Sequence, residues 1–396
     1  MKKTIVKFLS GAMGLMVAAC ASAMTIVPTF DSSITSDPNA AIMEADINAA
    51  IAAFESNYTD AVTVNIMFVS DPTVGLGQSS TFGTAVSYQQ YLAALKGRAT
   101  SLNDSNAISQ LPNSANDPVI GGSQINLNLA LARLLGLVPS NFYGAGNLDS
   151  TISFNMTLMN FTRPPTNINN YDLVSVAEHE MDEVLGTSSA LPSTNMINPA
   201  DLFRYTTNLA RSFTNAGPDN AYFSADGTNL FARYNTESDG DFGDWWSDTN
   251  YWAPHGITPH PQVQDAFGTP GSAEDMATNE MTLLDVVGFT LAVPAPPVSP
   301  TLSIARLGAG QANVSWTPTT SGFTLQERAN LLSGSWAASG TGTNNPATIT
   351  ISSGPKFYRL AYKATPAAVA AVDSVAQRLD TPPLLLNLHV LHPRRR

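Results

Sequence analysis

Hydrophobic and polar positions near the start of the chain alternate in a pattern that predicts a β-α-β unit. Residues 24–30 (MTIVPTF) and 62–68 (VTVNIMF) have the period and length of strands. Between them, residues 40–58 place apolar side chains at helical spacing. We therefore expect two parallel strands joined by a right-handed helical crossover.

Helices and strands continue to alternate after this unit. Residues 86–98 and 127–137 have helical periodicity, and residues 149–158 (DSTISFNMTL) predict a further strand. Within residues 171–191 (YDLVSVAEHEMDEVLGTSSAL), the segment around His179 then predicts a helix. This order predicts an α+β domain in which helices back a mixed sheet.

The next hundred residues are less regular. Asp226-Gly227 separates two short apolar runs at residues 222–224 and 230–234, which predicts a hairpin. A loop rich in glycine and proline follows. Residues 279–289 (NEMTLLDVVGF) predict a closing helix. We expect this part to form the lower side of a cleft.

A proline-rich segment at residues 293–301 marks a domain boundary, because such sequences form extended, semi-rigid linkers. The first domain would then span residues 24–292. Residues 302–363 contain short alternating runs, which predict a small all-β sandwich of fibronectin or immunoglobulin type with Trp316 in its core. Residues 364–396 show no reliable period, and we expect a disordered tail.

The first residues, 1–23, have the features of a signal peptide. Three lysines precede an apolar run, and small residues at 21–23 offer a cleavage site. The run that ends in Cys20 also resembles a lipoprotein box, so a lipid anchor on Cys20 is an open alternative. Both readings predict an exported protein, either secreted or anchored at the cell surface. Both also leave no thiol for a disulfide, because Cys20 is the only cysteine.

Composition limits the partners. The chain has 396 residues, which is enough for two domains. Only 13% of its residues are charged, and its net charge is −12. A negative surface argues against nucleic acids and anionic membranes as partners. We expect a monomer that binds a peptide or protein and touches a membrane only through a lipid on Cys20.

The predicted helix at residues 171–191 carries the sequence His179-Glu180-Met181-Asp182-Glu183. Residues four apart share one helix face, so His179 and Glu183 could hold one metal ion, with Glu180 beside a water bound to it. This is the H-E-x-x-H layout of zinc proteases with glutamate as the second ligand. The alternative is an acidic amphipathic helix without a metal, in which His179 and the glutamates lie on a solvated face.

A catalytic zinc needs a third protein ligand. Asp244, in the loop GDFGDWW, is our first choice, because its glycines allow tight turns and its aromatic residues could wall a pocket. The alternative for this loop is a plain turn or a calcium site built from Asp239, Asp241 and Asp244. His260, between two prolines, is the runner-up ligand. Asp201 is expected to cap a local segment instead.

Several motifs together resemble one family. They are TFDSSITSDPNAAIMEADINAAI, VAEHEMDEVLG, DLFRY, YFSADGTNL and QDAFGTPG followed by MTLLDVVGF. Residues 24–290, about two-thirds of the chain, resemble an uncharacterised family of secreted bacterial metalloproteases of the zincin, metzincin-like type.

The resemblance implies metal ligands at His179 and Glu183 and a general base at Glu180. Zincin relatives have a loop histidine where this chain has Asp244. Gly186 falls at the glycine of the longer metzincin signature, whereas Ser189, a poor ligand, falls at its third ligand position. Met276 is the nearest candidate for the methionine that lies under the metal in metzincins.

The leading functional hypothesis is therefore a secreted zinc-dependent endopeptidase. A peptide would add as a strand to an exposed sheet edge, for which residues 149–158 are the candidate. The alternatives are a surface adhesion protein with a structural metal or none, and a metal-dependent hydrolase that acts on esters or cell-wall amides.

Overall fold

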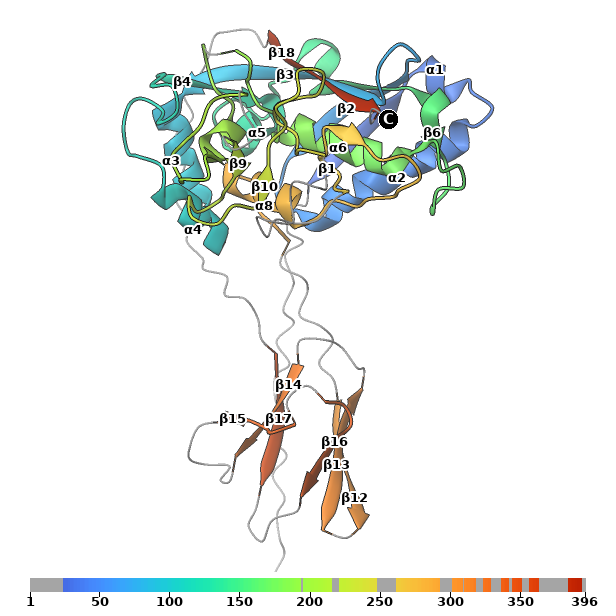
Figure 1. Cartoon of the computed structure of the whole chain (residues 1–396), viewed down its shortest axis with the longest axis vertical. Helices are drawn as coiled ribbons and strands as arrows, with labels where there is room; N and C mark the ends of the chain where they lie inside the picture. Colours follow the sequence, from blue (N-terminus) through green and yellow to red (C-terminus); the bar gives the residue numbers. More distant parts are fainter. Residues whose placement is uncertain are drawn as a thin grey trace, which may run out of the picture. The chain divides into compact units, whose positions relative to one another are not determined.

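The computed structural model describes residues 24–193, 195–215, 221–247, 261–292 and 384–393. It also describes residues 301–362 apart from 309, 318–322, 329–335, 342–343 and 351–355. The predicted signal peptide with Cys20, linker residues 293–300 and the runner-up ligand His260 lie outside the described residues. Two compact units share the chain (Figure 1): residues 1–292 with 370–396 form one, and residues 293–369 form the other. Within the described part, no helix has the length and hydrophobicity needed to cross a membrane.

The first unit is built on a seven-stranded mixed sheet. Its strands follow the order β1-β2-β5-β3-β18-β11, and β4 also pairs with β3. Strands β1, β2 and β5 are parallel, whereas β3 is antiparallel to β5, β4 and β18. The strands are β1 Thr25–Phe30, β2 Thr63–Ser70, β3 Gly77–Ser87, β4 Gln124–Asn128, β5 Ser150–Phe154, β11 Phe267–Gly268 and β18 Leu384–Pro393.

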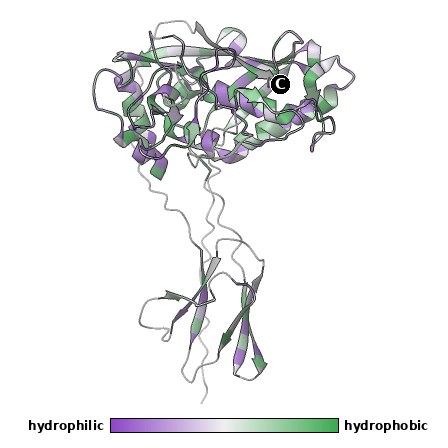
Figure 2. Cartoon of the chain, viewed as in Figure 1, coloured by the Kyte–Doolittle hydropathy of each residue, from purple (hydrophilic) through white to green (hydrophobic). Residues whose placement is uncertain are grey.

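Helices cover this sheet, and one of them, α6, lies at the centre of the unit with α2 packed against it (Figure 1). All thirteen residues of α6 are buried, so this helix is enclosed on every side. Hydrophobic and hydrophilic residues are interspersed along α2 and α3 (Figure 2), and each of these helices buries one face and exposes the other to water. The helices are α1 Ser32–Thr35, α2 Ala40–Asn57, α3 Tyr88–Arg98, α4 Leu102–Ser109, α5 Leu129–Leu134, α6 Leu173–Leu185 and α8 Thr278–Val287.

Short elements complete the first unit. Strands β8, β9 and β10 form a small antiparallel sheet, and β6 pairs with β7 in parallel. The predicted hairpin is confirmed, because β9 and β10 are antiparallel neighbours. These elements are β6 Met159–Asn160, β7 Tyr171–Asp172, β8 Arg204–Tyr205, β9 Tyr222–Phe223, β10 Ala232–Arg233 and the 3-10 turns η1 Ala145–Asn147, η2 Met156–Leu158 and η3 Pro199–Phe203.

The second unit contains two antiparallel three-stranded sheets, with strand orders β12-β13-β16 and β15-β14-β17. Val314, Trp316, Leu325 and Ala347 come from both sheets and form one buried cluster, in which Trp316 is 5% exposed. The strands are β12 Thr301–Gly308, β13 Gln311–Thr317, β14 Phe323–Arg328, β15 Ala337–Ala338, β16 Ala347–Thr350 and β17 Phe357–Tyr362.

The mixed α+β class and the opening β-α-β unit are confirmed, since β1 and β2 are parallel neighbours on either side of α2. Strand β3 was not predicted, because its sequence GQSSTFGTAVS is polar and rich in glycine. Because β3 extends to Ser87, the helix expected at residues 86–98 begins only at Tyr88. The Ser87 side chain forms a capping box with Gln90 at this point. The helix expected at 127–137 is shortened by β4 to α5.

Two further expectations were wrong. Residues 149–158 were expected at a sheet edge, but β5 lies between β2 and β3 in the sheet interior. Residues 364–396 were expected to be disordered, but residues 384–393 form the ten-residue strand β18, which pairs with β3. The sequence of this strand, LLLNLHVLHP, is a mostly apolar run without strict alternation, so its period does not predict a strand. The C-terminal segment therefore belongs to the first unit.

A buried ion pair ties α5 to the sheet. The guanidinium of Arg133 donates to both carboxylate oxygens of Asp149, at 2.7 and 2.8 Å, and both side chains are almost fully buried. Asp149 also accepts from the backbone N–H of Asn65 at the β2 side. Removal of one partner would leave a charged group in the interior without compensation.

We expect Arg133→Met to lower the free energy of unfolding of the first unit by about 3–5 kcal/mol, because Asp149 would lose its ion pair and two hydrogen bonds in a dry site. Urea denaturation followed by tryptophan fluorescence measures this. Asp275→Asn, which removes the exposed partner of Arg163, is the control and should cost less than about 1 kcal/mol. A loss below about 1 kcal/mol for Arg133→Met as well would show that the buried pair is not a strong constraint.

Candidate metal centre

Helix α6 is capped at its N-terminus by Asp172 and at its C-terminus by Gly186. The Asp172 side chain accepts from the backbone N–H of Ser175 at 2.8 Å and caps the first turn. The helix ends at Gly186, whose φ of 147° lies in a region that other residues rarely adopt. These two residues set the bounds of the helix that carries the motif.

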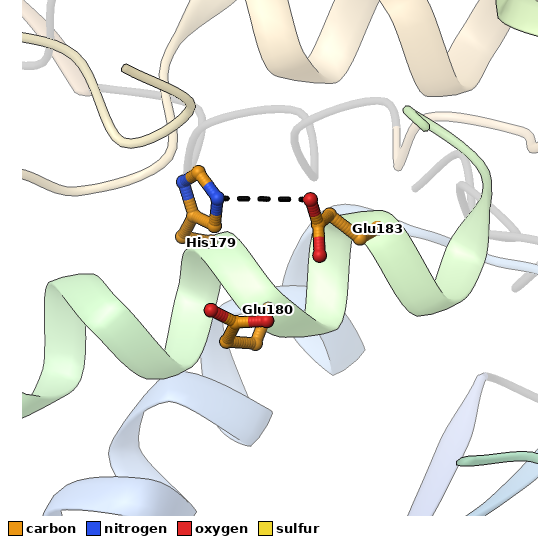
Figure 3. A group of neighbouring side chains, drawn as sticks. All are labelled: His179, Glu180 and Glu183. Carbon is orange, nitrogen blue, oxygen red and sulfur yellow. Dashed lines mark ion pairs between the residues drawn. The ribbon is translucent and has the colours of Figure 1, made fainter. Parts of the chain in front are cut away.

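His179 and Glu183 project from one side of α6 toward each other, whereas Glu180 lies on the next face (Figure 3). The His179 Nε2 atom is 3.8 Å from Glu183 Oε1. The Nδ1 atom of His179 lies 2.8 Å from the carbonyl oxygen of Val263. A carbonyl only accepts, so Nδ1 carries the proton and Nε2 is the nitrogen that faces Glu183, the usual arrangement behind a metal-binding imidazole.

Asp244 reaches the same point from a loop that is far away in the sequence. Its Oδ2 atom lies 3.8 Å from His179 Nε2, and Gln264 Nε2 donates to its Oδ1 at 2.9 Å. The backbone of the loop is held by bonds from Asn235 N to Asp244 O and from Trp245 N to Gln264 O, each 2.7 Å long. The two ligands of the motif and the predicted third ligand are thus brought together.

Glycine at position 243 makes this approach feasible. A Cβ atom on Gly243 would lie 2.6 Å from the backbone nitrogen of Ser189 and 3.0 Å from Ser188 Cα, both parts of a rigid backbone. The neighbouring Trp245 anchors the loop, because its ring stacks on Phe223 with centroids 5.8 Å apart. The loop that carries Asp244 is therefore placed by close backbone packing.

Glu180 is fully buried between α6 and the edge of β3. A Cβ on Gly77 would come within 2.3 Å of Glu180 Oε1, so glycine there leaves the space that the carboxylate fills. Among the described residues, neither oxygen of Glu180 has a hydrogen-bond partner of standard geometry. The Glu183 side chain and the backbone groups of Leu391 and Ser79 lower its pKa, against the larger effect of burial, which raises it.

Burial and mutual repulsion raise the pKa of the acidic side chains in this cluster. Burial raises the pKa of Glu180, Glu183 and Asp244 well above the usual range, since a charge is costly to remove from water. Asp241 raises the pKa of Glu180 and Asp244 further, and Glu180 does the same to Glu183. His179, Glu180 and Asp244 are 0% exposed and Glu183 is 1% exposed. A cation at this point would relieve the repulsion.

Two sets of side chains are close enough to share an ion. His179, Glu180 and Glu183 form one set, and Glu183, Asp241 and Asp244 form the other, with ligand atoms within 4.8 Å of one another in each. The sets share Glu183, so one compact centre joins α6 to the loop. Asp239, expected as part of an alternative calcium loop, belongs to neither set among the described residues.

Several members of the site could not be found from the sequence. The Ser79 hydroxyl of β3 donates to Glu183 Oε2 at 2.7 Å, and the carbonyl of Val263 orients His179. Gln264 holds Asp244 and lies 3.4 Å from His179 Nε2. Each is a common residue whose role comes only from the fold.

The remaining candidates have other partners. The Ser189 hydroxyl donates to Asp201, so it does not face the metal centre. Asp201 accepts from the backbone N–H of Asn198 at 2.9 Å, which confirms the expected cap. Met276 donates its backbone N–H to Glu178, and its sulfur lies 4.0 Å from the Tyr58 hydroxyl, as expected for a packing residue.

Comparison of the chain with protein-family models, with curated proteins and with solved structures gave no match.

The raised pKa values predict how metal and pH act together. A carboxyl with a raised pKa binds more protons in the folded state, so stability falls as pH rises above about 4, by about 1.4 kcal/mol per pH unit for each extra proton. A divalent ion replaces those protons. Zinc should therefore raise the Tm of chelator-treated protein more at pH 8 than at pH 5, as measured by calorimetry. An equal gain at both pH values would contradict the shared site. His179→Ala, which keeps only the carboxylate set of Glu183, Asp241 and Asp244, should show a smaller gain than the parent.

Gly243→Ala should move Asp244 away from His179, because the added Cβ meets the backbone of Ser188 and Ser189. We expect zinc affinity to fall at least about tenfold, as in the loss of one well-placed ligand contact. Titration against a fluorescent chelator measures this. Gly97→Ala is the matched control: it lies in α3 with no atom within 4 Å of the new Cβ, and it should leave the affinity unchanged. Equal affinity in both variants would remove Asp244 from the site.

Proposed function

We propose that this chain is an exported, zinc-dependent endopeptidase with a zincin-like catalytic unit. One observation carries the proposal: His179 Nε2 lies 3.8 Å both from Glu183 Oε1 and from Asp244 Oδ2, inside the protein and beside Glu180. A single ion can bridge atoms at such separations with small side-chain adjustments.

The donor set favours zinc. Zinc accepts imidazole nitrogen together with carboxylate oxygen and takes three protein ligands in catalytic sites. Calcium takes six to eight oxygen ligands, which an imidazole and two or three carboxylates do not provide. The two charges of Glu183 and Asp244 also balance a divalent ion, which leaves Glu180 and Asp241 as the further acidic groups of the centre.

Each protein group then has a defined task. When bound, the zinc ion supplies a Lewis acid that acidifies water and polarises a carbonyl. Glu180, which lies beside His179 and Glu183, would accept the proton of the attacking water and pass it to the leaving amine. Ser79 and the Val263 carbonyl keep Glu183 and His179 in their ligand orientations.

The rest of the chain fits an exported enzyme. Residues 1–23 supply a signal for export, with a lipid on Cys20 as the alternative to release. We propose that the two antiparallel sheets of the second unit form a fibronectin-like sandwich that spaces or attaches the catalytic unit. The net charge of −12 disfavours nucleic acid as a substrate.

One observation favours a second candidate, a non-catalytic surface protein with a structural metal. His179, Glu180, Glu183 and Asp244 are at most 1% exposed, and closed sites are typical of structural metals. In that case zinc removal would lower stability, but no Glu180 variant would change any hydrolytic activity.

Glu180→Gln separates the two candidates. The amide cannot accept a proton, so casein hydrolysis should fall by about 10²- to 10⁴-fold while the protein keeps one zinc per chain. His179→Ala should lose both zinc and activity. Zinc content by atomic emission and cleavage of labelled casein are the measurements.

Asp182→Asn is the matched control, because Asp182 is a buried acid on the same helix that belongs to neither metal-binding set. It should keep zinc and activity. If Glu180→Gln and Asp182→Asn cleave casein at the parent rate, Glu180 is not the base. If the protein binds zinc but neither the parent nor a variant with strand β18 disrupted cleaves casein, the structural candidate replaces the enzyme.

A further inference from the structure

The strand β18 holds an unusual position in the sheet. Thr81 of β3 pairs with both β5 and β18, and Gly83 pairs with both β4 and β18. Strands β5 and β4 therefore lie on one side of β3, and β18 lies on the other. Among the described strands, β18 is the one that covers this second side. Without β18, the backbone groups of β3 from Gly77 to Gly83 would form an open edge.

The same edge faces the metal centre. Gly77 packs on the Glu180 carboxylate, and Ser79 donates to Glu183. The end of β18 lies beside these residues: Leu76 N donates to the Leu391 carbonyl at 2.7 Å, and the Leu391 N–H approaches Glu180. An extended chain on this edge therefore passes directly over the proposed base.

The end of β18 also bridges to the opposite side of the centre. His392 and Pro393 pair in parallel with β11. The segment that leads into β11 includes Val263 and Gln264, which contact His179. Strand β18 thus spans the site from the sheet to the loop region, and Leu391 is 3% exposed. This is the path that an extended peptide would need in order to reach both Glu180 and His179.

An open strand edge binds extended peptides through its backbone, with little demand on side-chain identity. We propose that residues 384–393 occupy in cis the peptide-binding edge of β3, so that the centre is closed until an extended polypeptide segment displaces them. The external ligand class is therefore an unfolded or extended polypeptide that adds antiparallel to β3. The catalytic consequence rests on the proposed function, but the binding consequence does not.

The first experiment opens the edge within the full chain. The variant carries proline at both Leu388 and His389, two neighbouring residues of β18. Neighbouring residues of an antiparallel strand direct their N–H groups to opposite sides, so one of the two N–H groups bonds to β3 and is lost in the variant. The double alanine variant keeps the backbone and is the matched control. The probe is a fluorescein-labelled synthetic peptide of residues 380–396 (DTPPLLLNLHVLHPRRR), with a scrambled peptide of the same composition alongside.

We expect the proline variant to bind the probe at least tenfold more tightly than the parent or the alanine variant, because the tethered segment no longer competes at high effective concentration. Cleavage of labelled casein should rise by a similar factor. If the probe binds but casein is not cleaved by any form, the edge assignment stands and the endopeptidase proposal fails. If a folded, zinc-binding proline variant does not bind the probe, the inference is overturned.

A second variant covers the case in which the prolines prevent folding. A sequence-specific protease site placed within residues 370–380 is cut after the full chain has folded. The inference predicts that the released segment exchanges with the labelled 380–396 peptide, as followed by gel filtration and mass spectrometry, and that the scrambled peptide does not enter. A segment that stays in place against an excess of probe would show that β18 is a permanent sheet strand.

Discussion

Carboxylates that are removed from water repel one another strongly, and Glu180, Glu183 and Asp244 share a dry interior around one imidazole. Such an arrangement is costly unless protons or a cation lie between the charges. The unit keeps it through rigid neighbours, because α6 is enclosed and the loop of Asp244 packs backbone to backbone at Gly243. Much of the surrounding structure can be understood as the support that this cluster requires.

That support comes from two different parts of the chain. Helix α6 supplies His179 and Glu183, and β3 contributes the Ser79 hydroxyl and the space at Gly77. The irregular region after residue 191 supplies Asp244, and it also supplies the Val263 carbonyl that sets the tautomer of His179. A site assembled across the two parts forms only when both are folded, so binding of the proposed metal would be coupled to the stability of the whole first unit.

The sequence predicted the elements that carry strong periodicity or a motif. The β-α-β opening, α6, the hairpin of β9 and β10, and the meeting of His179 with Glu183 follow from spacing alone. Strand β3 was missed because its small polar residues face buried partners, such as Ser79 with Glu183, and show no hydrophobic period. Strand β18 was missed because its sequence does not alternate strictly, and its partner β3 lies some three hundred residues away in the chain.

The central claim is that His179, Glu183 and Asp244 hold one metal ion. X-ray absorption at the zinc edge, on protein loaded with one equivalent of zinc, tests it most directly. We predict one imidazole nitrogen at about 2.0–2.1 Å and carboxylate oxygens at about 2.0–2.2 Å, with the imidazole signal lost in His179→Ala. A spectrum of hydrated zinc with oxygen neighbours alone, or an imidazole signal that persists in His179→Ala, would contradict the claim.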